Sequence, residues 1–439
     1  MKPISIFICT LFCVPAIPLP AADPSADRSA TSPGVLTLAT VTQAVLSANP
    51  SLREARERAS ALAQRPAQAA AWEDPKLALS SRVARFVSIA PNGFTDQMVG
   101  LEQSIPISGR NQIRARILAT EVGVATEELR RRELDSVAKA RSAYFRLARD
   151  YTLLELNRSN ELSWQETIQS TRARFEVGTR SQADVLAAES ELARTAEARR
   201  DLERALSDDQ TELNVLMGRG PSSLLGRPTD VPREGHLDSL EGSRLQSLVL
   251  SRRPEVRMAE ARLTAAATQR KLAQRAWVPD PTLGVTAQRY NSASQVVSEV
   301  GAGVSFTLPW ANPGKYRALA KEAADAELAA QSAAQQARLE ALGRLRDQLA
   351  RVRANQHHVE LFRERLVPLA RQTLDATRTD YAAGRSAFAD LLLAQRNVRD
   401  TESTYRHHIA DLQMALADLE AVVGADLQLF PAARSPSRR

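Results

Sequence analysis

The sequence predicts a mixed, mainly α-helical fold in which long antiparallel coiled coils continue into four membrane-spanning β-strands per chain. Three observations predict it: an internal repeat, long stretches of helix-forming residues, and short stretches in which apolar and polar residues alternate. Glycine is scarce, with 18 among 439 residues, and aromatic residues make up only 5%. This composition favours long helices over a compact α/β fold.

The internal repeat is the strongest signal. The segment RFEVGTRSQADVLAAE at 174–189 recurs as DYAAGRSAFADLLLAQ at 380–395, an offset of 206 residues. Further segments recur in the same order at nearly the same offset: LSANPSLR as LSRRPEVR, AWEDPKL as AWVPDPTL, and VGLEQSIPISGR as AGVSFTLPWANPGK. Such self-similarity predicts a tandem duplication.

The repeat sets the expected domain boundaries. A first repeat at 38–216 and a second at 239–424 are joined by a linker at 217–238, and a tail follows at 425–439. Residues 1–22 have a lysine, an apolar run and small residues in the order of a signal peptide, and an extension at 23–37 follows. Both cysteines, Cys9 and Cys13, lie in this leader, so cleavage would leave a chain without cysteine. Neither cysteine follows the small residues that lipidation requires, so a lipid anchor is disfavoured.

Each repeat is expected to begin with a helix, at about 40–71 and 239–276, which ends before an Asp-Pro pair. Two strands then follow in each repeat, at 77–87 and 99–107 and at 283–290 and 299–308. Their length suits a tilted membrane-spanning strand, although an ordinary sheet with one wet face is the alternative. In the last strand we expect one set of side chains to face lipid and the other to face the lumen: Val300, Val304 and Phe306 against Glu299, Gly303 and Ser305.

Long helices follow the strands. Residues 110–173 contain no proline and predict a helix of roughly 95 Å. Residues 315–381 predict a similar helix with a kink at Pro368. Return helices are expected at 181–216 and 386–423, with apolar residues spaced as in a coiled-coil seam. Between each pair a glycine is expected to end the first helix in the left-handed conformation.

Four strands in one chain cannot close a barrel, because the smallest barrels need about eight. An open sheet in lipid would also leave unpaired backbone groups at its edges. Both problems disappear if several copies share one barrel and one helical tube. We therefore expect a cyclic homo-oligomer, most simply a trimer whose barrel has twelve strands, enough to leave a channel.

Several motifs resemble those of a known family: the hairpin tips FxxGxxxxADVL and YxxGxxxxADLL, the ANP and RRP starts of the repeats, and the segments IPISGR and LPWANPGK. With them the chain resembles the TolC-type outer-membrane efflux protein family over about residues 38–424. The resemblance implies a trimeric exit duct in the outer membrane, with a long periplasmic tube, that exports drugs or metal ions. It also implies a periplasmic adaptor and an inner-membrane pump as partners. Two alternatives stay open: a duct for type I protein secretion, and a periplasmic coiled-coil structural or adaptor protein.

The resemblance also implies two kinds of site. The tips would dock the adaptor through Val177, Gly178, Thr179, Ala383, Gly384 and Arg385, although plain tight turns are the alternative. Asp184 and Asp390 would line a pore constriction, where three copies bring six carboxylates together. The alternative is that each aspartate only stabilises a helix N-terminus through the helix dipole.

No other chemistry is indicated. Catalytic and phosphate-binding motifs are absent from the sequence, so neither an enzyme nor a cofactor is expected. The pairs His357-His358 and His407-His408 are adjacent on helices and point about 100° apart, which disfavours a metal site. The formal charge of +7 falls to +3 without Lys2 and the tail residues Arg434, Arg438 and Arg439, so no nucleic-acid partner is expected.

Overall fold

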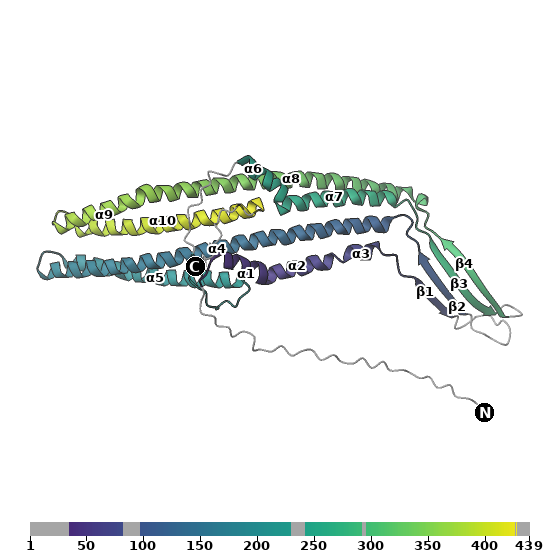
Figure 1. Ribbon diagram of the computed structural model, residues 1–439, viewed down its shortest axis with the longest axis horizontal. Helices are drawn as coiled ribbons and strands as arrows, with labels where there is room; N and C mark the ends of the chain where they lie inside the picture. Colours follow the sequence, from purple (N-terminus) through teal and green to yellow (C-terminus); the bar gives the residue numbers. More distant parts are fainter. Residues whose placement is uncertain (1–34, 82–96, 230–241, 292–295, 426, 428–439) are drawn as a thin grey trace, which may run out of the picture.

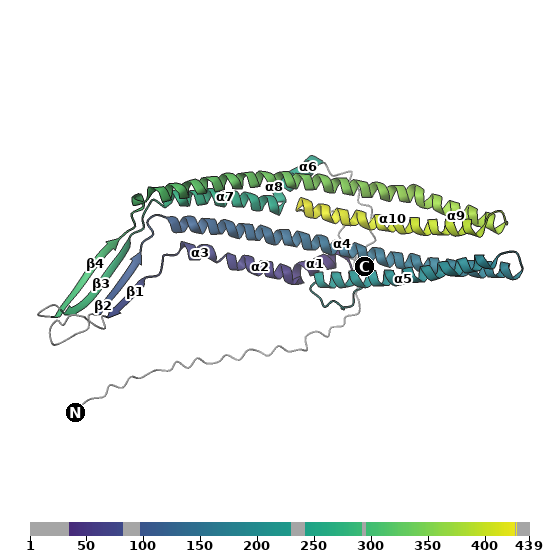
Figure 2. The same cartoon turned by 180° about the vertical axis from the view of Figure 1, so that it is seen from behind.

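The computed structural model describes residues 35–81, 97–229, 242–291, 296–425 and 427. The expected signal peptide lies outside these residues. The protein is elongated, with a sheet at one end and the turns of two helical hairpins at the other (Figure 1). Seen from behind, the two hairpins run side by side along the long axis (Figure 2). In the described part of the chain, no helix combines the length and the apolar run needed to cross a bilayer.

The helical start of each repeat is broken, contrary to the single helix expected at 40–71 and at 239–276. The first repeat has α1 (Leu38–Ala48), α2 (Pro50–Leu62) and α3 (Arg65–Ala70), and the second has α6 (Gly242–Arg252) and α7 (Pro254–Arg275). Proline causes the breaks, because it occupies the first positions of α2, α3 and α7 and disfavours helix in the residue before it. Asn49 caps α2, since its side-chain oxygen accepts a hydrogen bond of 2.9 Å from the Ser51 amide.

The four expected strands form one antiparallel sheet in the order β1-β2-β3-β4. Their bounds are β1 (Lys76–Ser81), β2 (Gln97–Ser104), β3 (Thr282–Asn291) and β4 (Val296–Ser305). The expected residues 82–87 of the first strand lie outside the described residues. Among the described residues, β1 pairs only with β2 and β4 only with β3, so each outer strand has an open edge there.

The sheet has one apolar and one polar face. Val304 pairs with Leu283, and Leu101 pairs with both Leu77 and Val285, so these side chains share a face. All of them are exposed. The opposite face has small and polar side chains, among them Glu299, which accepts hydrogen bonds from Gln288 and Tyr290 at 3.0 and 2.7 Å. The predicted division is therefore confirmed for the residues within β4, whereas Phe306 lies one residue beyond the strand. Contact with lipid stays a prediction.

Two long hairpins extend from the sheet. In the first, α4 (Arg110–Glu176) has 67 residues, about 100 Å, and returns as α5 (Gln182–Leu216). In the second, a 3₁₀ turn η1 (Pro309–Ala311) precedes α8 (Pro313–Leu361). A π-helical turn η2 (Phe362–Leu366) then leads into α9 (Val367–Ala382), which returns as α10 (Phe388–Val423).

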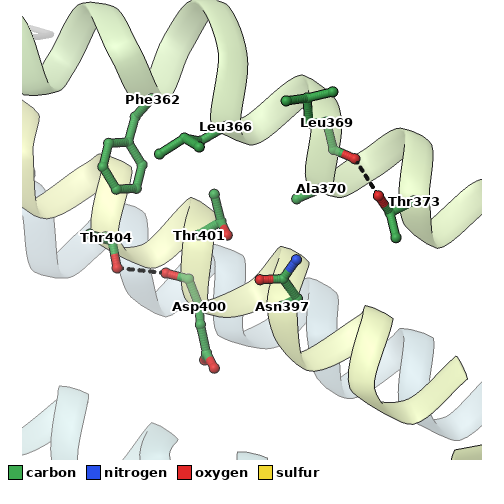
Figure 3. A pocket seen from close by; sticks show the side chains of 9 residues that line it. All are labelled: Phe362, Leu366, Leu369, Ala370, Thr373, Asn397, Asp400, Thr401 and Thr404. Atoms are coloured by element: carbon green, nitrogen blue, oxygen red, sulfur yellow. Dashed lines mark hydrogen bonds between the residues drawn. The ribbon is translucent and has the colours of Figure 1, made fainter. Parts of the chain in front are cut away.

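The helix is irregular just before Pro368, in this π-helical turn, whereas the predicted kink of the helix axis stays a prediction. Proline has no N–H and its ring clashes with the carbonyl four residues earlier, so an α-helical turn cannot continue there. A groove of about 360 Å³ lies here between α10 and the segment formed by η2 and α9. Figure 3 shows the side chains that line it. Phe362, Leu366 and Leu369 line it on one side, and Asn397 and Asp400 on the other.

The two repeats match in detail. Leu147 and Val352, and likewise Leu154 and Val359, are buried 205 residues apart, whereas Gly178 and Gly384 are 206 apart. The π-helical turn lies between Val359 and Gly384 and contains one residue more than an α-helical turn. This extra residue accounts for the increase of the offset from 205 to 206. Strand registers match too, because Ala78 pairs with Gly100 as Gly284 pairs with Gly303. These correspondences support the duplication.

Each repeat has its own apolar core midway along the rod. In the first, Val45 and Leu52 pack with Tyr144, Leu147 and Leu213. In the second, the core joins α6 and α8 to α10, whose apolar residues Leu412, Leu416, Leu419 and Val423 are buried. A third cluster lies near the hairpin tips and contains residues of both repeats. The two hairpins are therefore packed against each other at the end far from the sheet.

Candidate functional site at the hairpin tips

The first tip is a tight helix stop with an exposed apolar residue. Gly178 has φ +74°, in the left-handed region, and its amide donates to the Phe175 carbonyl at 2.9 Å. The Thr179 amide and hydroxyl both donate to the Arg174 carbonyl, at 2.9 and 2.8 Å. These are the bonds of a Schellman motif. The side chain of Val177 takes no part in these bonds and is 72% exposed, so it is available to a partner.

The second tip has the same backbone and a different surface. Gly384 has φ +75°, and the Arg385 amide donates to the Asp380 carbonyl at 2.8 Å. The Arg385 guanidinium also forms an ion pair of 2.6 Å with the Asp380 carboxylate. Ala383 takes the place of Val177, so this tip presents a charged pair and a methyl group. Both predicted left-handed glycines are confirmed, whereas docking at either tip stays a prediction.

Asp184 and Asp390 occupy the first turns of α5 and α10. The Asp390 carboxylate accepts a hydrogen bond of 3.1 Å from the Ala387 amide, as expected for an aspartate that caps its own helix. Asp184 is half-buried, and Ser181 caps α5 instead, by accepting a bond of 2.9 Å from the Ala183 amide. Both aspartates thus lie where the helix-dipole alternative applies, and Asp390 in addition caps its own helix. The pore constriction stays a prediction.

The sequence did not reveal that the two hairpin tips contact each other. Tyr381 is 5% exposed, and its carbonyl accepts hydrogen bonds from Arg180 at 3.2 Å and Arg174 at 3.4 Å. The Arg180 guanidinium also lies 4.3 Å from the centre of the Tyr381 ring, a cation–π contact. Phe175, the counterpart of Tyr381 in the first repeat, is 42% exposed. Identical positions in the repeat thus differ in burial, which no sequence signal indicates.

A second contact between repeats lies deeper in the hairpins. The Glu191 side chain on α5 is 2% exposed and accepts a hydrogen bond from Arg396 of α10. Arg194 and Arg399 lie 2.9 and 3.8 Å from the same carboxylate. The hydrogen bond from Arg396 lowers the pKa of Glu191, so the carboxylate stays ionised. Arg396 and Arg399 of α10 thereby hold the second hairpin to this buried acid, whereas Arg194 lies on α5 itself.

The histidines come closer than the sequence indicated. His358 of α8 and His408 of α10 stack with ring centres 4.9 Å apart, and Phe362 lies 4.9 Å from His408. Burial, followed by the neighbouring His358, lowers the pKa of His408. Among the described residues, no group of three histidine, cysteine or acidic side chains is placed to hold a metal ion.

The fold and the tips define a class of protein: a long rod that presents a strand sheet at one end and paired helical turns at the other. A family model described as outer membrane efflux protein matches residues 41–219 and 245–425. The chain therefore belongs to the outer membrane efflux protein family. It is an outer-membrane protein with a long periplasmic helical part, of a family whose members are channels rather than enzymes.

Curated relatives match part of the chain. It is 28% identical over 221 residues to the toluene efflux pump outer membrane protein TtgF of Pseudomonas putida, covering 49% of this chain and 45% of that protein. It is 28% identical over 170 residues to the antibiotic efflux pump outer membrane protein ArpC of Pseudomonas putida, covering 38% of this chain and 35% of the relative. The chain thus spans less than half the length of these curated relatives.

Solved structures match nearly the whole fold. The outer-membrane channel OprN superposes with a TM-score of 0.77 at 20% identity, over 89% of this chain and 90% of that one. The CmeC outer membrane channel of Campylobacter jejuni gives a TM-score of 0.74 at 16% identity, over 88% and 85% of the two chains. At these identities the likeness shows the fold, which is that of outer-membrane channel subunits.

Proposed function

We propose that this protein is the outer-membrane exit duct of a tripartite efflux system and that it works as a homotrimer. The sheet carries the proposal, because it combines an exposed apolar face with an open edge on each outer strand, β1 and β4. Unpaired edges are not tolerated in lipid, so the sheet must close with other copies. Three copies give twelve strands, wide enough for a channel.

Small organic molecules are the cargo that we propose. The relatives named for toluene and antibiotic efflux support this class over metal ions. A periplasmic adaptor and an inner-membrane pump would complete the system, since an outer-membrane duct has no energy source of its own. Type I protein secretion would use the same duct with a different pump, and the export assay below distinguishes the two.

Adaptor docking is assigned to the tips. Val177 and Leu186 are 72% and 57% exposed near the end of the first hairpin. Exposed apolar side chains beside a tight backbone turn suit the apolar side of a partner helical hairpin. Together with Gly178 and Thr179 they form the stronger candidate surface. Ala383, Gly384 and Arg385 form the weaker one, because the Arg385–Asp380 ion pair occupies it.

The pore constriction is assigned mainly to Asp184. Its counterpart Asp390 already accepts a hydrogen bond from its own helix. In a closed ring of three copies, Asp184 would supply three carboxylates around one axis, which attract cations.

The test begins with the mass of the detergent-solubilised protein, corrected for bound detergent. We expect three chains, and a monomer would contradict the proposal. Cells that lack their own duct should then regain tolerance of toluene and antibiotics when this protein is supplied with its adaptor and pump. Secretion of a protein substrate without gain of tolerance would favour the secretion alternative.

Docking is tested by Val177→Arg, with Leu224→Arg as the matched control. Leu224 is 79% exposed in the linker, so both substitutions add a charge at an exposed apolar residue. We expect Val177→Arg to abolish adaptor crosslinking and export while trimer levels stay normal, and Leu224→Arg to change neither. Normal crosslinking in Val177→Arg would remove the tip as the docking site.

A further inference from the structure

We propose a specific junction between copies: β4 pairs with the partner's β1 in a fixed register, and Lys315 forms an ion pair with the partner's Asp74. The inference rests on the proposed oligomer and adds the residues that join it. It follows from the contact that the two repeats already make inside one chain. In a ring of repeats, the junction between chains must resemble the junction within a chain.

Inside the chain, Asp280 joins the repeats just before β3. Its carboxylate accepts bonds from the Ser108 amide at 2.7 Å and the Ser108 hydroxyl at 2.8 Å. The Arg110 guanidinium donates to the same carboxylate at 2.6 Å, and this carboxylate is mostly buried. One step along the chain, the Ile105 amide donates to the Pro281 carbonyl at 2.9 Å. The start of the second repeat's strands is thereby fixed to the start of α4.

The same groups recur at the two outer ends of the sheet. Asp74 stands 206 residues before Asp280, ahead of β1, and Lys315 stands 205 residues after Arg110, at the start of α8. Both offsets are those found elsewhere in the repeat. Asp74 and Lys315 are exposed, and neither has an ion-pair partner in the described ranges of the chain. An acid on one edge and a base on the other are thus left for a neighbouring copy.

The strand register follows from the same equivalence. Within the chain, Glu102 of β2 pairs with Gly284 of β3. Glu102 corresponds to Ser305, at an offset of 203, and Gly284 corresponds to Ala78, at an offset of 206. Ser305 is therefore placed opposite the partner's Ala78, and Val304 opposite the partner's Leu79. This register brings apolar side chains together on the apolar face and small ones together on the polar face, although the faces were not used to derive it.

The junction between copies is expected to be weaker than its counterpart within the chain. Pro313 stands where the first repeat has Ser108, at the same offset of 205 as Lys315. Proline offers neither an N–H nor a hydroxyl, so two of the bonds that Asp280 receives have no equivalent. The carboxylate of the partner's Asp74 would therefore contact only the ammonium group of Lys315.

Disulfide crosslinking tests the register. The only cysteines, Cys9 and Cys13, lie in the expected leader, so the variant Ala78→Cys/Ser305→Cys would carry just two reactive thiols. Directly opposed residues lie about 4.5–5.5 Å apart, within the range of a disulfide, whereas a shift of two residues gives about 7–8 Å. We expect oxidation to link most chains into a covalent trimer on denaturing gels.

Two matched variants accompany it. Ser80→Cys/Ser305→Cys, two residues out of register, should give less than a tenth of that crosslinking. Glu102→Cys/Gly284→Cys should oxidise within one chain and leave its size unchanged, since this pair is opposed in the same sheet. Crosslinking of the shifted pair instead would overturn the register while leaving the proposed duct intact. A wild-type monomer in detergent would overturn both.

Charge exchange tests the ion pair. Asp74→Lys and Lys315→Asp should each lower the temperature at which the trimer dissociates, because like charges then meet at the junction. The double variant Asp74→Lys/Lys315→Asp should restore most of the loss in dissociation temperature. Single variants without effect, or a double variant that only adds the two losses, would overturn the ion pair.

Discussion

Replacing Glu191 by glutamine tests whether a buried carboxylate holds the two hairpins together. Removal of one partner from a fully buried ion pair costs about 3–5 kcal/mol. The cost here should be smaller, because Arg194, Arg396 and Arg399 are 65%, 35% and 30% exposed and can turn to water. Glutamine also keeps the volume and one acceptor. We therefore expect Glu191→Gln to lower the free energy of local opening by about 2 kcal/mol.

Amide hydrogen exchange of the trimer in detergent measures this opening. A loss of about 2 kcal/mol corresponds to roughly thirtyfold faster exchange in α5 and α10 near the tip. Glu189→Gln is the matched control, because Glu189 lies on the same helix and its ion pair with Arg172 is exposed on both sides, at 41% and 57%. Such a surface pair contributes at most about 1 kcal/mol. Equal exchange rates in the two variants would refute the reasoning.

The same carboxylate predicts an acid dependence. Because the hydrogen bond from Arg396 lowers the pKa of Glu191 in the folded protein, the unfolded state binds the proton more tightly. The stabilisation is therefore complete at neutral pH, above the unfolded pKa of about 4.3, and is lost as the pH falls through the lower folded value. After correction for the intrinsic exchange rate at each pH, the protection of tip amides should fall on acidification in the wild type, and less so in Glu191→Gln. An unchanged acid response in that variant would assign it to other groups.

Three further predictions concern the backbone, the sheet and the histidines. Gly178→Ala should cost only about 1 kcal/mol in thermal unfolding, because open space surrounds the added methyl and only the left-handed φ is strained. Gly218→Ala should abolish folded trimer, since its methyl would lie 2.4 Å from a backbone carbonyl oxygen; similar yields of the two variants would contradict this. Val300→Arg, in the middle of β4, should cost roughly 2–4 kcal/mol if the apolar face meets lipid, and Gly301→Arg on the opposite face far less, measured as folded trimer in the outer membrane. Because burial lowers the pKa of His408, the neutral form favours folding, and thermal stability should fall as the pH drops below about 6.5, a step that His408→Gln should lack.

The sequence predicted the order of strands and long helical hairpins, because these elements follow from periodic patterns of apolar residues and from the positions of glycine and proline. The strand alternation, the proline-free stretch from 110 and the tip glycines each have a local physical cause, and the structure has all of them. The broken helices at the start of each repeat were missed, although Pro50 and Pro254 were visible in the sequence. The single helices expected across them were wrong, because proline disfavours helix in the residue before it.

The contacts at the tips could not be predicted in the same way. Arg180 makes a cation–π contact with Tyr381, and Arg396 donates a hydrogen bond to Glu191. Both contacts join residues of different repeats. Sequence periodicity reports the face that a helix buries and not the partner that covers it. The stacking of His358 on His408 could not be predicted for the same reason, since the two residues lie on different helices, α8 and α10.

The π-helical turn Phe362–Leu366 has a consequence for stoichiometry. It makes the second hairpin one residue longer than the first, so a ring of three chains would contain six hairpins of two alternating kinds. The grooves between neighbouring hairpins would alternate as well, half of them sealed by Tyr381 and Glu191 and half formed where two chains meet. A partner selective for one kind of groove would bind three times per ring. A partner that fills every groove would need two different binding surfaces.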